Sequence, residues 1–242
     1  MPRYTDIHSH ILYGVDDGSK DMECSLRMLK AAEKENIGRI ILTPHQKPDR
    51  HCVSVEGTYK RIAVLQDTLR QNHIDIKLYP GSELLYHSEL TERLEAQKVC
   101  TMAGSHYALT EFLPNEDMQY IRNGLYDLIC AGYWPIIAHA ERCHALVKDL
   151  DNIDELIQMG CYIQMNAGSL TGDWGFGLKH ASRKIMKEGL VHFLGTDAHS
   201  DKGKRVPKME NCAKWLDKKL GSQAAAKLLY QNAEAIFADE EL

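Results

Sequence analysis

The chain has 242 residues, of which 44% are hydrophobic, and its formal net charge is -5. This length and apolar content are typical of one large domain that buries a substantial core. The negative net charge gives no basic footprint that would argue for nucleic acid or an anionic membrane, so we expect neither as a partner. No run approaches the roughly 18 apolar residues that span a bilayer, and the first residues have no signal-peptide pattern, so we expect no membrane insertion and a cytoplasmic protein.

The cysteines point to the same compartment. The chain has 7 of them, an odd number, scattered and without a C-x-x-C pair. We therefore expect reduced, mostly structural thiols. The cysteine-dependent phosphatase loop C-x5-R is not supported, because Asp149 stands six residues after Cys143 and Lys218 stands six residues after Cys212. Thiol catalysis is not expected.

Strand-like and helix-like stretches alternate along the whole chain. Short apolar runs predict strands at 4–8, 39–43, 76–80, 107–111, 135–139, 161–165 and 191–195. Amphipathic stretches predict helices at about 21–36, 56–72, 88–97, 118–132, 151–159, 179–188, 209–220 and 222–232. Helix C-caps are expected at Gly38, Gly132, Gly160 and Gly189.

This alternation favours a parallel α/β fold. The chain has no glycine-rich nucleotide-binding fingerprint, so the seven predicted strands favour a closed or nearly closed (β/α) barrel. An open, doubly wound sheet is the alternative.

The ends of the predicted strands carry ionisable side chains. His8 and His10 end the first strand in i, i+2 register, so both point to the same face. The later strand ends supply His45, Glu83, Glu111, His139, Asn166, Asp197 and His199. A lone histidine at a strand end is more often a capping or core residue, but active sites of β/α barrels form at this face. The whole set therefore predicts a metal site.

Nine side chains are candidate ligands. They are five histidines, at 8, 10, 45, 139 and 199, and four carboxylates, Asp17, Glu83, Glu111 and Asp197. One zinc ion takes about four ligands, so this number suits two or three ions with a bridging carboxylate. Nitrogen and oxygen ligands without thiolate fit manganese, iron, zinc or cobalt better than a structural zinc.

The charge of such a site indicates an anionic substrate. Three divalent ions would outweigh four carboxylates, so the site would attract a group such as phosphate. Arg142 and Arg205 lie on loops at the same face, and guanidinium groups bind phosphate oxygens bidentately. The alternative for each arginine is an ordinary surface position.

Six segments of the chain together resemble a known family. They are DIHSHILYGVDDG at 6–18, TPH at 43–45, GSE at 81–83, LTEF at 109–112, IAHAER at 137–142 and TDAH at 196–199. In this order they resemble the PHP (polymerase and histidinol phosphatase) superfamily, and more closely the bacterial protein-tyrosine phosphatases of the CpsB/CapC/YwqE type. The resemblance implies a single PHP phosphatase domain over 1–242, built as a distorted (β/α)7 TIM-like barrel with three metal ions, usually manganese.

The resemblance also implies how the ligands are shared. The first ion would take His8, His10, Glu83 and Asp197, the second Glu83, Glu111 and His139, and the third Asp17, His45 and His199. Asp16 is the rival of Asp17. Arg142 and Arg205 match the arginines that such phosphatases use on the phosphate. Glu111 before a phenylalanine matches the tyrosine-phosphatase branch, whereas Gln46 and Cys143 depart from common residues of the family and could alter substrate preference.

The expected reaction is hydrolysis of phosphotyrosine in a protein. A hydroxide bridging two ions would attack, while the third ion and the arginines hold the phosphoryl oxygens. The proton donor is open between His45 and His199. By resemblance, the substrate would be a tyrosine kinase of capsule or exopolysaccharide synthesis. Two alternatives remain: a phosphatase of histidinol phosphate or another small molecule on the same trinuclear site, and a non-catalytic barrel that binds a phosphorylated partner.

Overall fold

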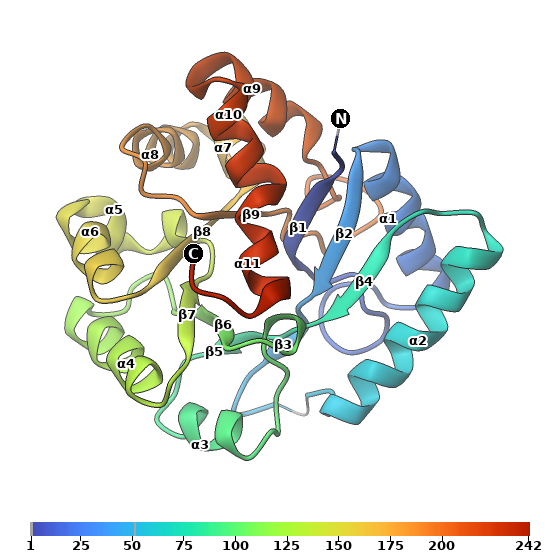
Figure 1. Ribbon diagram of the computed structural model, residues 1–242, viewed down its shortest axis with the longest axis horizontal. Coiled ribbons are helices and arrows are strands. Elements are labelled where there is room, and N and C mark those ends of the chain that lie inside the picture. The colour runs from blue at the N-terminus through green and yellow to red at the C-terminus, as the bar shows by residue number, and fades with distance from the viewer. Residues whose placement is uncertain (1, 51) are drawn as a thin grey trace.

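The computed structural model describes residues 2–50 and 52–242, and within them parallel strands lie at the centre with helices around them (Figure 1). One sheet has the order β1 (Tyr4–Ser9), β2 (Ile37–Leu42), β4 (Lys77–Pro80). The other has the order β3 (His45–Gln46), β5 (Glu83–Leu85), β6 (Tyr107–Glu111), β7 (Trp134–Ile137), β8 (Tyr162–Asn166), β9 (Phe193–Gly195). Every predicted strand is confirmed to within two residues at each end.

Two strands are longer than predicted and are broken in the middle. After β2 the chain passes residues 43–44 and continues as β3, and after β4 it passes 81–82 and continues as β5. Pro44 lies in the first break, where its missing amide hydrogen cannot join a ladder. β3 and β5 were not predicted. They pair in parallel with His45 opposite Glu83, so the breaks bring these two side chains together.

The first and last strands also approach each other. The backbone N–H of Asp197, after β9, donates to the carbonyl of His8 at 2.8 Å, and the N–H of His10 donates to the carbonyl of Ala198 at 2.9 Å. The parallel sheet is therefore strongly curled, in keeping with the prediction of a β/α arrangement.

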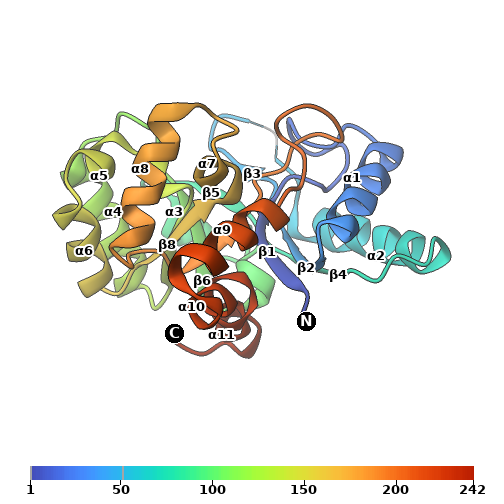
Figure 2. The ribbon, with the colours of Figure 1, turned by 90° about the horizontal axis from the view of Figure 1, so that it is seen from above.

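Helices cover the outside of the curled sheet (Figures 1 and 2). The longer ones are α1 (Met22–Lys34), α2 (Val55–Gln71), α4 (Met118–Cys130), α8 (Phe176–Lys187) and α9 (Glu210–Leu220). The shorter ones are α3 (Leu90–Glu95), α5 (His144–Lys148), α6 (Asp151–Gln158), α7 (Ala167–Thr171), α10 (Ser222–Ala226) and α11 (Ala233–Ala238), and single turns form η1 (Met102–Gly104), η2 (Ala140–Arg142) and η3 (Lys227–Gln231). All eight predicted helices are present, while α5, α7 and α11 are too short for their periodicity to be recognised.

The expected C-cap at Gly38 is wrong, because this residue lies inside β2. Asn36 takes the left-handed conformation after α1 instead, with φ of 61°. A Cβ atom at position 38 would lie 2.7 Å from Cβ of Arg3, so the glycine allows a close approach of the N-terminal segment. Gly132, Gly160 and Gly189 do have positive φ after their helices, as predicted.

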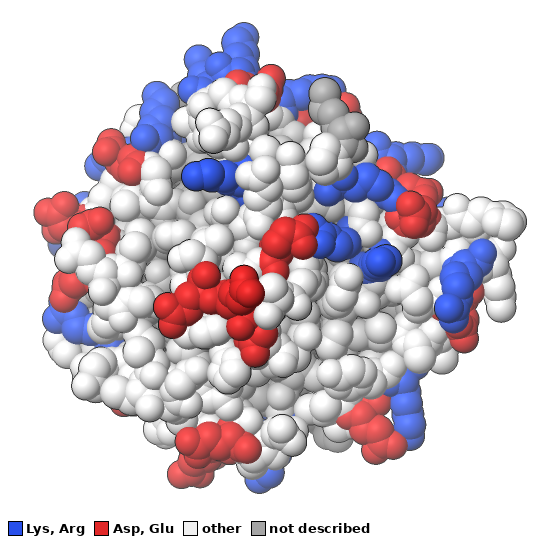
Figure 3. Space-filling model, viewed as in Figure 1, with Lys and Arg blue, Asp and Glu red and all other residues white. Residues whose placement is uncertain are grey.

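Helix α11 covers the amino ends of the strands (Figure 1). Ala233 and Ile236 of this helix pack against Tyr107 and Phe193, which begin β6 and β9. Figure 2 shows both chain termini at this end, and the loops that follow β1 and β9 at the other. Acidic side chains gather near the centre of the end that α11 covers (Figure 3), which makes it unsuitable for a phosphate group.

Each of the 7 cysteines is free, as expected, and five of them are buried. Over the described ranges, no helix has the length and apolarity needed to cross a bilayer.

Candidate metal centre

Glu83 is the centre of a cluster of imidazoles at the carboxyl ends of the strands. Its Oε2 lies 3.4 Å from His8 Nε2, 3.1 Å from His10 Nε2 and 2.8 Å from His45 Nδ1. Its Oε1 lies 2.8 Å from His139 Nε2. The Glu83 side chain is only 1% exposed. One buried carboxylate thus contacts four histidines, which come from β1 and the residue that follows it, from β3 and from the loop after β7.

The nine predicted ligands all lie in this cluster. Three groups of side chains place one potential ligand atom of each member within 4.8 Å of the others. They are His8, His10 and Asp197; His45, Glu83 and Glu111; and His10, Asp17, His45 and His199. His139 is outside these groups, but its Nε2 lies 2.8 Å from Glu83 and 3.7 Å from Glu111. The side chains predicted from the strand ends therefore lie together in one cluster.

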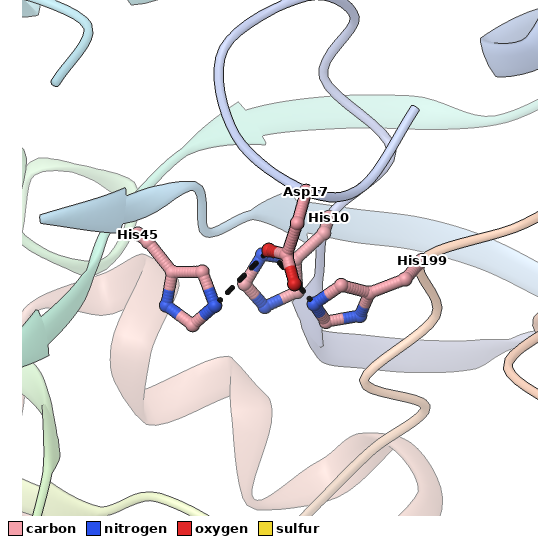
Figure 4. A group of neighbouring side chains, drawn as sticks. All are labelled: His10, Asp17, His45 and His199. Atoms are coloured by element: carbon pink, nitrogen blue, oxygen red, sulfur yellow. Dashed lines mark ion pairs between the residues drawn. The ribbon is translucent and has the colours of Figure 1, made fainter. Parts of the chain in front are cut away.

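Asp16 and Asp17 make different contacts with the cluster. Asp16 Oδ2 accepts a hydrogen bond from His10 Nδ1 at 2.7 Å, and Oδ1 accepts from the backbone of Gly18. Asp17 instead points between two imidazoles (Figure 4), with Oδ1 3.4 Å from His45 Nε2 and 3.6 Å from His199 Nε2. Asp17 thus faces the cluster directly, whereas Asp16 orients His10 from behind.

Three imidazoles are held through their outer nitrogen. His8 Nδ1 lies 3.1 Å from Gln164 Oε1, His10 Nδ1 lies 2.7 Å from Asp16, and His199 Nδ1 lies 2.9 Å from the carbonyl of Asp197. An acceptor at Nδ1 fixes a proton there, so Nε2 is the nitrogen that each ring turns into the cluster. This is the usual arrangement of histidines that bind metal ions.

A chain of hydrogen bonds from β8 supports the cluster. The side-chain carbonyl of Gln164 also accepts from the backbone N–H of His139 at 2.6 Å. Its amide donates to Asn166 Oδ1 at 2.8 Å, and Asn166 Nδ2 donates to Asp197 Oδ2 at 2.9 Å. Asn166 was predicted as the end of a strand, whereas Gln164 was not among the predicted site residues. The i, i+2 spacing of these two residues on a predicted strand was the available signal.

A buried carboxylate below the cluster was also missed. Asp6 accepts hydrogen bonds from the backbone N–H and the hydroxyl of Thr196, at 2.8 and 2.5 Å, and so ties β1 to the end of β9. Burial raises its pKa to about 6, although the hydrogen bonds from Thr196 oppose the shift. Its i, i+2 relation to His8 was the signal in the sequence.

The pKa shifts of the buried carboxylates show that nearby positive charge stabilises their ionised forms. Burial alone would raise the pKa of Glu83 and Asp197, yet nearby His8 and His10 hold both below their usual range. Burial would likewise lower the pKa of His10, but the hydrogen bond to Asp16 and the nearby carboxylate of Glu83 raise it to about 10. A cation placed among these carboxylates would be stabilised by the same attraction.

Other members of the cluster are shifted in the opposite direction. Burial and the charge of Glu83 raise the pKa of Glu111. Burial and the charge of His10 lower the pKa of His199 to about 3. The two carboxylates therefore repel each other, and so do the two imidazoles when they are protonated. Shifted pKa values of this kind are common at functional sites.

Two residues of the cluster have left-handed backbone conformations. His139 has φ of 33° and Asp197 has φ of 51°. Residues other than glycine adopt this region uncommonly, although Asn, Asp and His do so more often than most. Such residues concentrate at functional sites. The hydrogen bonds from His139 N to Gln164 and from Asp197 N to His8 hold the two backbones in place.

Gly18 makes room for the turn that carries Asp16 and Asp17. A Cβ atom there would lie 2.5 Å from Cβ of His10 and even closer to the His10 carbonyl oxygen. We expect Gly18→Ala to lower the free energy of unfolding by about 1–3 kcal/mol through overpacking. Urea denaturation measures the change. Gly177→Ala is the matched control, because a Cβ there meets no atom within 4 Å, and it should be neutral or slightly stabilising. Equal losses in the two variants would contradict this role of Gly18.

Both predicted arginines reach the cluster, and both contact Asp197. Arg142 Nη2 lies 3.0 Å from Asp197 Oδ2, and its guanidinium carbon lies 5.3 Å from the centre of the Trp174 ring. Arg205 Nη2 lies 3.3 Å from Asp197 Oδ1 and 2.6 Å from His199 Nε2. Their side chains are 27% and 34% exposed, so both guanidinium groups combine a contact inside the cluster with access from solvent.

The residues fit a set of metal ions. His45 Nδ1, Glu83 Oε2 and Glu111 Oε2 are buried and have no hydrogen-bond partner in the described part of the chain. His45 Nδ1 and Glu83 Oε2 are 2.8 Å apart, but the angles between them are not those of a hydrogen bond. Unpaired buried polar atoms are costly, and these three are nitrogen and oxygen atoms of the kind that bind transition metals.

Comparisons with known proteins identify the family of the chain. The sequence profile of the family described as "Capsular polysaccharide synthesis, CpsB/CapC" matches residues 4–238. CapC of Staphylococcus aureus is 36% identical over 195 residues, which cover 81% of this chain and 76% of CapC. The tyrosine-protein phosphatase YwqE of Bacillus subtilis is 30% identical over 237 residues, which cover 98% of this chain and 92% of YwqE.

Solved structures give the same result. One from work on YwqE of Bacillus subtilis and CpsB of Streptococcus pneumoniae, described as unique metal-dependent tyrosine phosphatases, has a TM-score of 0.91 at 30% identity and covers 98% of this chain and 95% of that one. A phosphotriesterase homology protein of Escherichia coli has a TM-score of 0.63 at 12% identity, covering 98% of this chain and 99% of that one, and shares the fold alone.

Proposed function

The chain belongs to the CpsB/CapC family, and we propose that it is a metal-dependent phosphatase that hydrolyses phosphotyrosine in proteins. The observation that carries the proposal is the convergence of five imidazoles, four carboxylates and two arginines at one end of the strands. The match to relatives named as tyrosine-protein phosphatases favours this substrate over histidinol phosphate.

We propose three divalent ions, with manganese as the resident metal and iron, zinc or cobalt as alternatives. One ion would bind His8, His10, Glu83 and Asp197, and a second would bind Glu83, Glu111 and His139. The third would bind Asp17, His45 and His199. Each set is supported by the short distances between its members. Bound ions of this kind lower the pKa of water and stabilise negative charge on phosphoryl oxygens.

The chain itself would bind and orient the phosphate. Arg142 and Arg205 lie on opposite oxygens of Asp197 and reach solvent, so a phosphoryl group entering the site would meet donors from both sides. Trp174 lies against Arg142 and would limit the directions in which its guanidinium can turn. A phenolate is a stable leaving group, so tyrosine phosphate needs less help from a protein acid than an alkyl phosphate does.

We propose further that residues 1–242 form one PHP domain in which the strands close as a distorted (β/α)7 barrel. The backbone hydrogen bonds between β1 and the segment after β9 support this closure. The family description supports a role in capsular polysaccharide synthesis. The protein substrate that we propose is an autophosphorylating tyrosine kinase of that process. A cytoplasmic location is also proposed, and the free cysteines are consistent with it.

The test is a comparison of substrates on manganese-loaded protein. We expect kcat/KM for a phosphotyrosine peptide to exceed that for histidinol phosphate by at least about tenfold, a difference of about 1.4 kcal/mol in transition-state stabilisation. A preference for histidinol phosphate would contradict the assignment of substrate, and no hydrolysis of either compound would contradict the assignment as a phosphatase.

Asp16 and Asp17 give a sharper test of the ligands. Asp17→Asn should reduce by one the number of manganese ions bound per chain, because it removes a charged ligand. Asp16→Asn should keep that number and weaken binding by about 10- to 100-fold, because it removes the partner that orients His10. Calorimetric titration with manganese measures both quantities. If Asp16→Asn lowered the number of bound ions and Asp17→Asn only weakened their binding, Asp16 would be the ligand.

A further inference from the structure

A basic groove lies next to the metal centre and has no part in the chemistry described so far. It has a volume of about 370 Å³ and is lined by Lys47, Arg50, His87, Arg93 and Lys98, with Glu89 as the one carboxylate among its lining residues. Asp49 is also close enough for its charge to act on His87, so four permanent cations outnumber two carboxylates, which favours an anion.

The basic groove adjoins the metal centre at β3 and at Lys47, which follows this strand. Gln46 lines the groove and directly follows His45, whose Nδ1 lies 2.8 Å from Glu83. Gln46 is buried, and its side-chain oxygen accepts a hydrogen bond from Arg93 at 3.2 Å. Lys47, the next residue, is close enough to Glu111 for its charge to act on that carboxylate. A substrate whose phosphate is at the cluster therefore has the groove within reach of its neighbouring residues.

His87 offers an unused donor in the basic groove. Its Nδ1 accepts a hydrogen bond from the backbone N–H of Glu89 at 3.3 Å, so the neutral ring carries its proton on Nε2. This Nε2 is buried and has no hydrogen-bond partner among residues 2–50 and 52–242. A donor left in this state indicates that an acceptor from outside the chain belongs there.

The amino end of helix α2 also favours an anion in the basic groove. Ser54 lines the basic groove and caps α2, a helix of 17 residues that begins at Val55. The amino end of a helix carries partial positive charge, which favours a nearby anion. This effect adds to the four cations and to the free donor of His87.

From these observations we propose that the basic groove binds a second anionic side chain of the substrate, a carboxylate or another phosphotyrosine close in sequence to the one being hydrolysed. The inference rests on the proposed function, since it places the first phosphotyrosine at the metal centre. The phosphatase would then prefer acidic or multiply phosphorylated segments over isolated phosphotyrosines.

The test uses peptides with one phosphotyrosine and a variable residue at each position up to three places away. The variable residue is alanine, glutamate or a non-hydrolysable phosphonate analogue of phosphotyrosine. At the best position, glutamate should lower KM about tenfold with little change in kcat, the size expected for two exposed ion pairs formed together. The phosphonate should lower KM at least as much, and a response to the phosphonate alone would identify phosphotyrosine as the occupant. The effect should weaken as salt is added.

The matched variants remove two charges each. Arg50→Ala combined with Lys98→Ala removes two positive charges from the basic groove. This double variant should lose the preference for the glutamate peptide while its kcat on the alanine peptide stays the same. Lys218→Ala combined with Lys219→Ala removes two positive charges from the exposed end of α9 and should keep the preference for the glutamate peptide. Equal KM values for all peptides, or equal losses in both double variants, would overturn the proposal.

A binding measurement separates this proposal from the proposed function. Fluorescence anisotropy with unphosphorylated peptides should show about tenfold tighter binding of the glutamate peptide than of the alanine peptide, and the Arg50→Ala and Lys98→Ala double variant should lose the difference. This result would stand even if no peptide were hydrolysed. Hydrolysis of every peptide without any dependence on the flanking charge would reject the basic groove and leave the phosphatase intact.

Discussion

Removing divalent metal ions with a chelator should abolish hydrolysis of a phosphotyrosine peptide, and adding manganese should restore it. We expect a loss of at least about 10³-fold in kcat, because the ions supply several kcal/mol of charge stabilisation and each 1.36 kcal/mol is a factor of ten. The side chains that remain, including Arg142 and Arg205, hold an anion but lack a strong nucleophile. The measurement is kcat on protein dialysed against chelator, before and after manganese is added.

Unfolding must be excluded as the cause of this loss. Circular dichroism of the dialysed protein should match that of the loaded protein, because the core between sheet and helices does not include the cluster. Manganese at 100 times its dissociation constant should add about 2.7 kcal/mol to the free energy of unfolding, which a thermal melt detects. Full activity in the dialysed protein, with metal absent by elemental analysis, would contradict the metal assignment.

Glu83→Gln should have the largest effect of any single substitution in the cluster. Glu83 contacts four imidazoles and is proposed to bind two ions, so the change removes one negative charge from both. We expect kcat to fall by about 10³- to 10⁴-fold, equivalent to about 4–5 kcal/mol. The size of glutamine is nearly that of glutamate, so the loss reports charge rather than packing.

The control for this substitution is Glu95→Gln, an exposed carboxylate on α3 whose loss should leave kcat unchanged. Metal content of the Glu83→Gln protein should fall as well, since the bridging ligand is altered. Retention of more than a tenth of wild-type kcat would exclude Glu83 from the centre of the site.

The sequence predicted the candidate site better than its surroundings. Residues at the carboxyl ends of parallel strands must converge, so the positions of His8, Glu111 and His139 follow from the strand pattern alone. Glu83 was placed correctly although β5 was not predicted, because its distance from the end of β4 is short. A strand of two or three residues has too few positions for periodicity to appear.

The residues that support the cluster could not be identified from the sequence. Gln164 contacts His8 and His139, which are 156 and 25 residues away, and Asp6 contacts Thr196 at a separation of 190. Such contacts depend on how the sheet curls, and a local pattern does not encode that. The different contacts of Asp16 and Asp17 likewise depend on the position of His10 relative to the turn.

The basic groove illustrates the same limit. Its cations come from the loop after β3, from α3 and from the residues that follow it, which read separately as ordinary solvated charges. Only the fold brings them beside Gln46 and the metal centre. Surface charge therefore became informative only after the positions of the elements were known.

The most direct test of the central claim is kcat on a phosphotyrosine peptide, measured as a function of the manganese bound per chain. If the cluster around Glu83 is the catalytic centre, activity should rise with occupancy and reach its maximum at three ions per chain. Turnover at zero bound metal equal to that of the loaded protein would contradict this account, as would full occupancy without hydrolysis of the peptide.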